Sequence, residues 1–371
     1  MSRLTQRSSL GERQEVVYPK TPTRSVNEGE VDRRSRSHFN LVGGRQFFPL
    51  ALAMVSLLCL SRFGSQVLGQ DAAVVDAQAK LPMLTTPYGE VAIFPADNAW
   101  NRNVSHLKLH AKSEAWLQSV GLDKPLHPDF GTVWKGVPNG IPFVAVSPTQ
   151  VKSAVQFEYS DESDVGPYPI PPNPPIEGGS HAPADADRHV LMIDAKNKKL
   201  YELYQVHSLP GGKWKAGSGA IFDLSSNALR PAGWTSADAA GLPIFPGLAR
   251  YDEIVELGKL QHALRFTVKR TQRAYVLPAT HFASNSTSPN LPPMGMRVRL
   301  KASFDTSKFP RLSQVLLQGL KTYGMLLADN GGDWFVSGAP DARWDDDAIS
   351  TLKRVKVRDF EVVDTGPIVT R

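Results

Sequence analysis

Residues 158–189 read EYSDESDVGPYPIPPNPPIEGGSHAPADADRH, a stretch in which prolines separate many acids and histidines. Proline fixes φ and lacks a backbone donor, so this stretch cannot form a helix or a central strand. Apolar runs typical of strands flank it closely, SAVQFEY before and VLMID after. Connections this long inside a compact domain are usually functional or disordered, and the flanking strands favour function. The segment is predicted to be a proline-stiffened loop that holds polar groups over a β scaffold.

Short apolar runs on both sides of this loop predict a mainly β fold. HVLMID and KLYELYQVH form a predicted hairpin, in whose turn Asn197 tolerates left-handed geometry. Residues 296–304 alternate basic and apolar side chains with a period of two, which is typical of a strand. Two helices are predicted, over 311–327 from its apolar face and over 345–355 from its acidic start. We expect a β-sandwich or irregular barrel with a few short helices, and an α+β fold as the alternative.

The N-terminal part of the chain is typical of an export signal. Residues 1–45 form a basic polar n-region, and 46–70 hold an apolar core with a cleavage region. The apolar run FFPLALAMVSLLCL is short for a membrane span, although an uncleaved anchor stays an alternative. Residues 71–90 are predicted to be a linker and 91–371 a single globular domain. The protein is expected to be secreted or periplasmic, with membrane contact only through the signal segment.

Composition excludes several classes of function. Residues 1–70 hold ten of the 42 Lys and Arg but only five of the 36 acids, so the remainder is nearly neutral. Without a basic patch, nucleic acid is not an expected partner. Cys59 is the only cysteine and lies in the signal core, which excludes disulfides, cysteine-bound zinc and thiol catalysis in the mature chain. No glycine-rich phosphate motif occurs in a suitable context, so nucleotides are not expected either.

Several motifs resemble a family of secreted proteins, mostly bacterial with some fungal members. These motifs are ADNAWN (96–101), HPDFG (127–131), SGAIFDLSSNALRP (218–231), PPMGMRVRLKA (292–302) and YGMLLADNG (323–331). The resemblance covers most of residues 91–364. It implies export and one continuous domain, and it implies no activity because the family has none assigned.

The central loop supplies carboxylates and histidines for acid and base chemistry. A pair of carboxylates on either side of a glycosidic bond suits glycoside hydrolysis. Each of these acids has the alternative of being a solvated turn residue. The predicted catalytic candidates are Asp161, Glu162, Glu177, Asp223, His189 and His281, with Arg188 to bind or orient.

A metal site is a further hypothesis for the same loop. His181 and His189 flank two aspartates in the spacing H-x3-D-x-D-x-H, which matches no zinc motif. Carboxylate oxygens in loops suit calcium, and the candidate ligands are Asp164, Asp185 and Asp187. No other cofactor is expected.

Six tryptophans lie in turn-rich sequence, where their flat faces suit stacking on sugar rings. The predicted substrate-binding aromatics are Trp134, Trp214, Trp234 and Tyr168. Together with the acids, they predict an exported carbohydrate-active enzyme, a glycoside hydrolase or a polysaccharide lyase, whose partner is a glycan or polysaccharide. The alternative is a non-catalytic secreted glycan-binding or cell-envelope protein.

Overall fold

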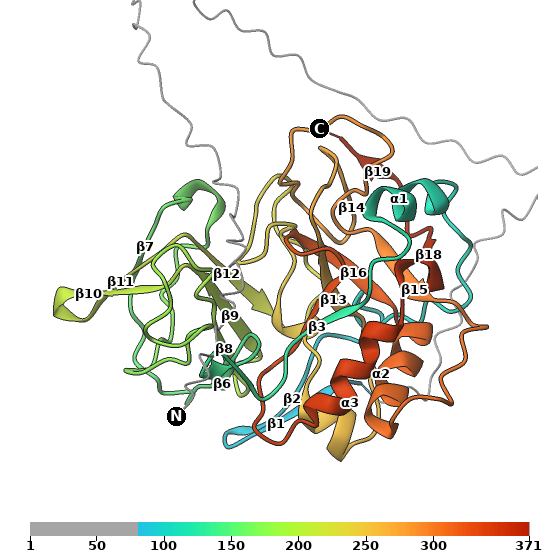
Figure 1. The fold of residues 1–371 in the computed structure, drawn as a ribbon. Coiled ribbons are helices and arrows are strands. Elements are labelled where there is room, and N and C mark those ends of the chain that lie inside the picture. The colour runs from blue at the N-terminus through green and yellow to red at the C-terminus, as the bar shows by residue number, and fades with distance from the viewer. Residues whose placement is uncertain (1–80, 371) are drawn as a thin grey trace, which may run out of the picture. The chain divides into compact units, whose positions relative to one another are not determined.

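The computed structural model describes residues 81–370 (Figure 1). The predicted n-region, the signal segment and residues 71–80 lie outside the described residues. The rest of the predicted linker belongs to an antiparallel hairpin of β1 (Met83–Thr86) and β2 (Gly89–Ala92). Gly89 closes its turn with φ 116°, and Leu84 and Val91 join the hydrophobic core. Residues 83–90, which the sequence analysis assigned to the linker, therefore belong to this hairpin together with Val91 and Ala92.

A four-stranded sheet carries the flanks of the proline-rich loop, with strand order β12-β9-β8-β6. Its strands are β6 (Phe143–Ala145), β8 (Val190–Asp194), β9 (Lys199–Tyr204) and β12 (Ser218–Asp223). β8 and β9 form the predicted antiparallel hairpin. The positive φ of its turn, 53°, belongs to Lys198. Asn197 instead donates from its side chain to Asp194 at 2.7 Å, so it stabilises the turn through its amide.

A six-stranded mixed sheet has the order β18-β15-β16-β13-β17-β3. Its strands are β3 (His127–Asp129), β13 (Leu264–Val268), β15 (Arg297–Leu300), β16 (Met325–Asn330), β17 (Phe335–Ser337) and β18 (Phe360–Val363). The helix α2 (Arg311–Thr322) ends five residues before the predicted Leu327. It ends there because Gly324 takes φ 66°, where a Cβ would lie 2.0 Å from the Val298 oxygen. The following apolar residues are then buried in β16.

The remaining elements are short. The helices are α1 (Ser113–Val120) and α3 (Asp346–Ser350), and single helical turns are η1 (Ser160–Glu162), η2 (Pro210–Gly212), η3 (Phe245–Gly247), η4 (Asp252–Glu256), η5 (Thr351–Arg354) and η6 (Val357–Asp359). The other strands are β4 (Val133–Trp134), β5 (Val137–Pro138), β7 (Val155–Phe157), β10 (His207–Leu209), β11 (Lys213–Ala216), β14 (Tyr275–Val276) and β19 (Ile368–Val369). The predicted mainly β class is confirmed as a β-rich α+β fold of several small sheets. Among residues 81–370, no helix is both long enough and apolar enough to cross a membrane.

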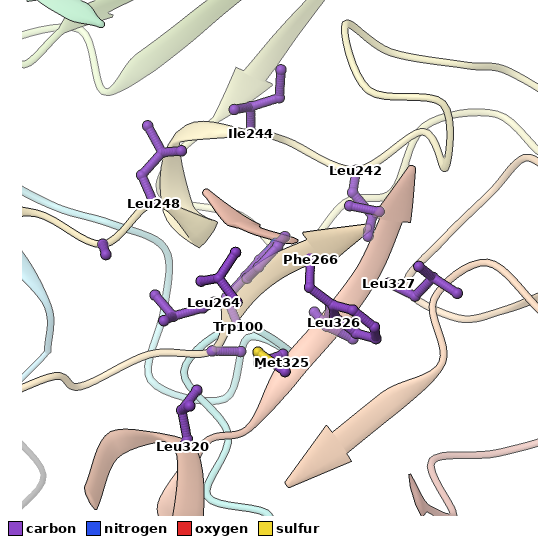
Figure 2. Packing of buried hydrophobic residues seen from close by; sticks show 14 of the residues in the cluster. Trp100, Leu242, Ile244, Leu248, Leu264, Phe266, Leu320, Met325, Leu326 and Leu327 are labelled. Carbon is purple, nitrogen blue, oxygen red and sulfur yellow. The ribbon is translucent and has the colours of Figure 1, made fainter. Parts of the chain in front are cut away.

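The four-stranded sheet is buried on both faces. On β8, Leu191 and Ile193 belong to the large core shared with the six-stranded sheet, and Val190 and Met192 belong to a smaller core. Part of the large core is shown in Figure 2. Tyr168, from the proline-rich loop, completes the smaller core. The loop therefore covers the outer face of this sheet, which explains why β8 is apolar at almost every position.

Candidate functional site

The position of His189 follows from the alternation of β8. Side chains on a strand alternate between faces, so His189 lies on the same face as Leu191 and Ile193. That face meets the large core, and His189 is only 3% exposed. The proline-rich loop thus ends by directing a histidine inward, between the two sheets.

Both ring nitrogens of His189 face acceptors. Nδ1 lies 2.5 Å from Glu177 Oε2, and Nε2 lies 3.0 Å from the carbonyl oxygen of Ala237. Two acceptors require two donors, so the geometry fits the imidazolium form. Burial opposes this charge, but the negative charge of Glu177 and its hydrogen bond raise the pKa of His189 to about 9. Burial likewise opposes ionisation of Glu177, and the charge of His189 outweighs it, so the pKa of Glu177 lies below its ordinary value.

Asp187 is the third polar side chain at this end of the loop. One carboxylate oxygen each of Glu177 and Asp187 and one nitrogen of His189 lie within 4.8 Å of one another. The backbone holds them together, because Glu177 N–H donates to the His189 oxygen at 3.1 Å and Gln205 N–H donates to the Asp187 oxygen at 2.8 Å. Asp187 is exposed, so the group is open to solvent on its side.

Arg188, predicted to bind substrate, is buried inside the loop instead. Its φ of 45° turns its side chain away from those of its neighbours. Nε donates to the Val206 oxygen at 3.0 Å, and an Nη1 hydrogen is donated to the Ala182 oxygen at 2.7 Å. Arg188 therefore holds the loop in place, and its guanidinium is not available to a ligand.

The six-stranded sheet supplies a cation and an acid to the same region. Arg265 on β13 makes two parallel bonds to Asp238, Nε to Oδ2 at 2.8 Å and Nη2 to Oδ1 at 2.7 Å. Arg265 also donates to the Ser337 hydroxyl on β17. Ser337 pairs in register with Asp129 on β3. Asp129, Ser337 and Arg265 therefore lie in a row across three adjacent strands.

Two acids in this region have raised pKa values. Desolvation by the surrounding protein, and then the negative charges of Glu177 and Asp187, raise the pKa of Asp129 although this residue is exposed, and Arg265 acts in the opposite direction. Burial and then the charge of Asp238 raise the pKa of Asp329 well above its ordinary value. We call Asp129, Glu177, Asp187, His189, Arg265 and Asp329 the His189 cluster. It combines a carboxyl group whose pKa is lowered, Glu177, with carboxyl groups whose pKa is raised, Asp129 and Asp329.

A second pair of predicted catalytic residues, His281 and Glu162, lies near the segment that contacts His189 and Arg265. His281 Nε2 lies 4.0 Å from Glu162 Oε2, and His281 Nδ1 lies 2.7 Å from the Ala239 oxygen. The three consecutive residues 237–239 thus contact His189, Arg265 and His281 in turn. The sequence analysis named both histidines and both glutamates as catalytic candidates. The structure places them in two separate pairs, which residues 237–239 connect.

Two predicted catalytic acids lie outside both pairs. Asp161 is exposed on η1. Asp223 ends β12, where it accepts hydrogen bonds from Ser225 and Lys199, and these bonds lower its pKa to about 2. Asp223 therefore stabilises a turn at the end of β12. It is not a member of the His189 cluster.

The predicted aromatic platform is dispersed. Tyr168 is fully buried and its hydroxyl donates to the Asp164 oxygen at 2.7 Å, so it cannot stack on a ligand. Trp134 is 63% exposed on the β4–β5 hairpin. Trp214 is half-buried on β11, and Trp234 is half-buried with the Arg230 guanidinium 5.5 Å from its ring. The other four tryptophans of the described chain, Trp100, Trp116, Trp334 and Trp344, are buried in the core.

The structure separates the predicted calcium ligands. Asp164 binds Arg230 at 2.6 Å and the Ile221 N–H at 2.8 Å, and Asp185 is exposed. Among the described residues, the ligand-type atoms that lie close enough for one ion come from Glu177, Asp187 and His189. A divalent cation there would have to displace the proton on His189 Nδ1, because metals bind the neutral ring.

Asp129, Arg265 and Asp329 are the cluster members that are absent from the predicted site residues. Asp129 and Asp329 lie in the motifs HPDFG and YGMLLADNG. The sequence does contain a signal for Arg265, which is a charged residue inside the apolar strand HALRFTV (262–268). Because arginine is rarely buried without a partner, its position predicts a nearby acid. No family model matches this chain, and neither a curated protein nor a solved structure matches it.

Proposed function

We propose that this chain is an exported carbohydrate-active enzyme that hydrolyses glycosidic bonds at the His189 cluster. The observation that supports the proposal is the opposite tuning of neighbouring carboxyl groups. Glu177 is held ionised by His189, whereas Asp129 has a raised pKa partly because Glu177 and Asp187 are negative. Pairs of titratable groups pushed apart in pKa are the usual basis of acid and base roles.

Each residue then has a defined role. Asp129 protonates the glycosidic oxygen as the bond from that oxygen to the anomeric carbon breaks. Glu177, through the oxygen that His189 does not bind, either accepts a proton from the attacking water or attacks the anomeric carbon first. His189 is a positioning residue that keeps Glu177 charged and oriented. Arg265, fixed by Asp238, limits the negative charge of the cluster.

A hydrolase is favoured over a lyase by two contacts. A lyase needs a free base and a cation that neutralises a uronate. Tyr168, whose hydroxyl a lyase could use as its base, is buried, and the charge of Arg265 is already balanced by Asp238. Of the bases that a lyase could use, His281 remains, and its Nε2 lies 4.0 Å from Glu162 Oε2.

The test measures release of reducing ends from a panel of polysaccharides. We expect Asp129→Asn and Glu177→Gln each to lower kcat about 10²–10⁴-fold, the range for loss of acid or base catalysis. Asp161→Asn is the matched control, an exposed acid from the same loop that should keep its activity. Circular dichroism checks that each variant folds. The proposal fails if the wild type cleaves no glycan, or if only Asp161→Asn loses activity.

A second candidate is glycan binding without cleavage, which the exposed ring of Trp134 favours. Lys135 Nζ lies 5.9 Å from the same ring, so this hairpin presents an aromatic face with a neighbouring cation. Calorimetry that shows saturable glycan binding without product, lost in Trp134→Ala and kept in Glu177→Gln, would select this candidate over the enzyme.

A further inference from the structure

A cavity of about 270 Å³ is lined by side chains that do not belong to the His189 cluster. Much of its wall is apolar and includes Trp100, Leu242 and Leu326, which Figure 2 labels in the buried core. Such a volume, with an apolar wall and a few polar groups, is typical of the smaller ligand sites. None of the residues assigned a catalytic role above lines it.

The charged groups of this cavity are mainly arginines. Arg102, Arg230 and Arg297 line it, and Asp97 is the one acid among its described lining residues. Asp97 is exposed and accepts a hydrogen bond from Asn227 at 2.8 Å. Arg230 is paired with Asp164 at 2.6 Å. The cavity therefore carries an excess of positive charge.

Arg297 is the decisive residue, because it is 2% exposed and no described acid pairs with it. Its bonds go to carbonyl oxygens: Nε to Tyr323 at 2.8 Å, Nη1 to Ala99 at 2.6 Å, and Nη2 to Tyr323 and Arg102. Carbonyl oxygens satisfy N–H groups but leave the net charge uncompensated. Burial, together with the nearby charge of Arg102, lowers the pKa of Arg297 to about 9. A buried cation without a counter-ion is costly unless an anion completes the site.

We propose that this cavity binds a small organic anion, a carboxylate with an apolar body. The carboxylate would lie toward Arg297, which has five N–H groups and makes four hydrogen bonds to carbonyl oxygens. The apolar body would lie against Trp100, Leu242 and Leu326. Ligand binding at this cavity is independent of glycan cleavage, since the two sites share no side chain.

The test uses octanoate as the probe and 1-octanol as its uncharged analogue, with binding to the full chain measured by calorimetry. We expect one octanoate per chain, and binding of octanol weaker by about tenfold or more, since a charge-assisted bond contributes about 1.5–3 kcal/mol. Equal binding of both probes, or no binding of either, overturns the proposal.

Two variants locate the bound anion. Arg297→Gln removes the charge and should weaken octanoate binding about tenfold or more while octanol binding stays the same. Arg297 also connects several loops, so its substitution could destabilise the fold, and a second variant is needed. Ala228→Trp serves this purpose, because Ala228 is exposed and lines the cavity, where a large ring would block binding. Glu177→Gln should bind octanoate like the wild type, so failure of the glycosidase proposal leaves this one intact. Octanoate binding that survives Ala228→Trp would place the ligand elsewhere and reject the site.

Discussion

His189 and His262 each lie between a glutamate carboxylate and a main-chain carbonyl oxygen. His262 Nε2 lies 2.8 Å from Glu253 Oε2, and its Nδ1 lies 2.8 Å from the Ala263 oxygen. His189 makes the corresponding contacts with Glu177 and Ala237. The two rings are almost equally buried, at 3% and 1% exposure. By its own contacts, neither histidine would be preferred as a functional residue.

Their surroundings differ in charge balance and in access. Glu253 also binds Arg250, and its side chain is 4% exposed, so the Arg250 guanidinium and the His262 ring enclose one buried acid. The side chain of Glu177 is 27% exposed and has further acids nearby, Asp129 and Asp187. Arg250 also binds Asp252 at 3.3 Å, so a second acid lies at each of the two groups. The first arrangement is a closed group around a buried glutamate, and the second is an open cluster whose glutamate solvent can reach. Access to a carboxylate beside a fixed cation is what a proton-transfer site needs, so the open cluster is the better candidate.

The largest expected effect is on stability, and it falls on the closed group. Glu253→Gln leaves Arg250 and His262 buried without their shared anion, and we expect a loss of about 3–5 kcal/mol in the free energy of unfolding. Glu177→Gln should lose less, about 1–3 kcal/mol, because its site reaches solvent. Chemical denaturation of both variants gives the comparison. The contrast between the closed group and the open cluster is refuted if Glu177→Gln lowers the free energy of unfolding more than Glu253→Gln does.

A pH series sharpens the contrast at the open cluster. The pKa of His189 is about 9, above its ordinary value of 6.5, so the stability it contributes is complete below pH 6.5 and is lost as pH rises toward 9. The total is about 3 kcal/mol, of which about 2 kcal/mol is lost above pH 7.5. We expect this loss between pH 7.5 and 9.5 in denaturation experiments. Starting at pH 7.5 avoids most of the titration of Glu202, whose burial raises its pKa to about 7. Arg297, whose burial lowers its pKa to about 9, acts in the opposite direction, so the loss assigned to His189 is the difference between the wild type and a variant without this histidine.

His189→Gln provides the control for the pH series. A neutral amide there should remove the alkaline loss between pH 7.5 and 9.5, whatever it does to the stability at pH 7. His262→Gln keeps His189 and should keep the loss. If His189→Gln retains the full alkaline decline, another group is responsible and the imidazolium assignment is wrong.

Local patterns were enough to predict some of this molecule from the sequence. The β8–β9 hairpin and the start of α2 follow from turn residues and apolar spacing, which act over a few positions. The loop was also identified as the source of Glu177 and His189, because prolines and ionisable residues are visible in the sequence. These features depend on near neighbours in the chain, so one sequence suffices to find them.

The partners of Glu177 and His189 could not be predicted, because sheet pairing brings them from distant positions. Asp129 enters through the pairing of β3 with β17, and Arg265 through β13 beside β17. Arg297 shows a second reason. Its alternation with apolar residues is typical of a half-exposed strand, yet it is buried, because carbonyl oxygens of Tyr323, Ala99 and Arg102 surround its guanidinium. Sequence periodicity locates a face but does not identify what covers it.

The smallest effect concerns Asp187, whose negative charge contributes to the raised pKa of His189 after Glu177 does. Asp187→Asn should therefore lower the midpoint of the His189 titration by less than about one pH unit, equivalent to less than about 1.4 kcal/mol. NMR of the ring protons measures this, with His262→Gln used to separate the two buried signals. Asp185→Asn is the matched control, an exposed acid two residues away that should leave the titration unchanged. Equal shifts in both variants would mean that His189 responds to the summed charge of the loop, and Asp187 would then have no special place in the cluster.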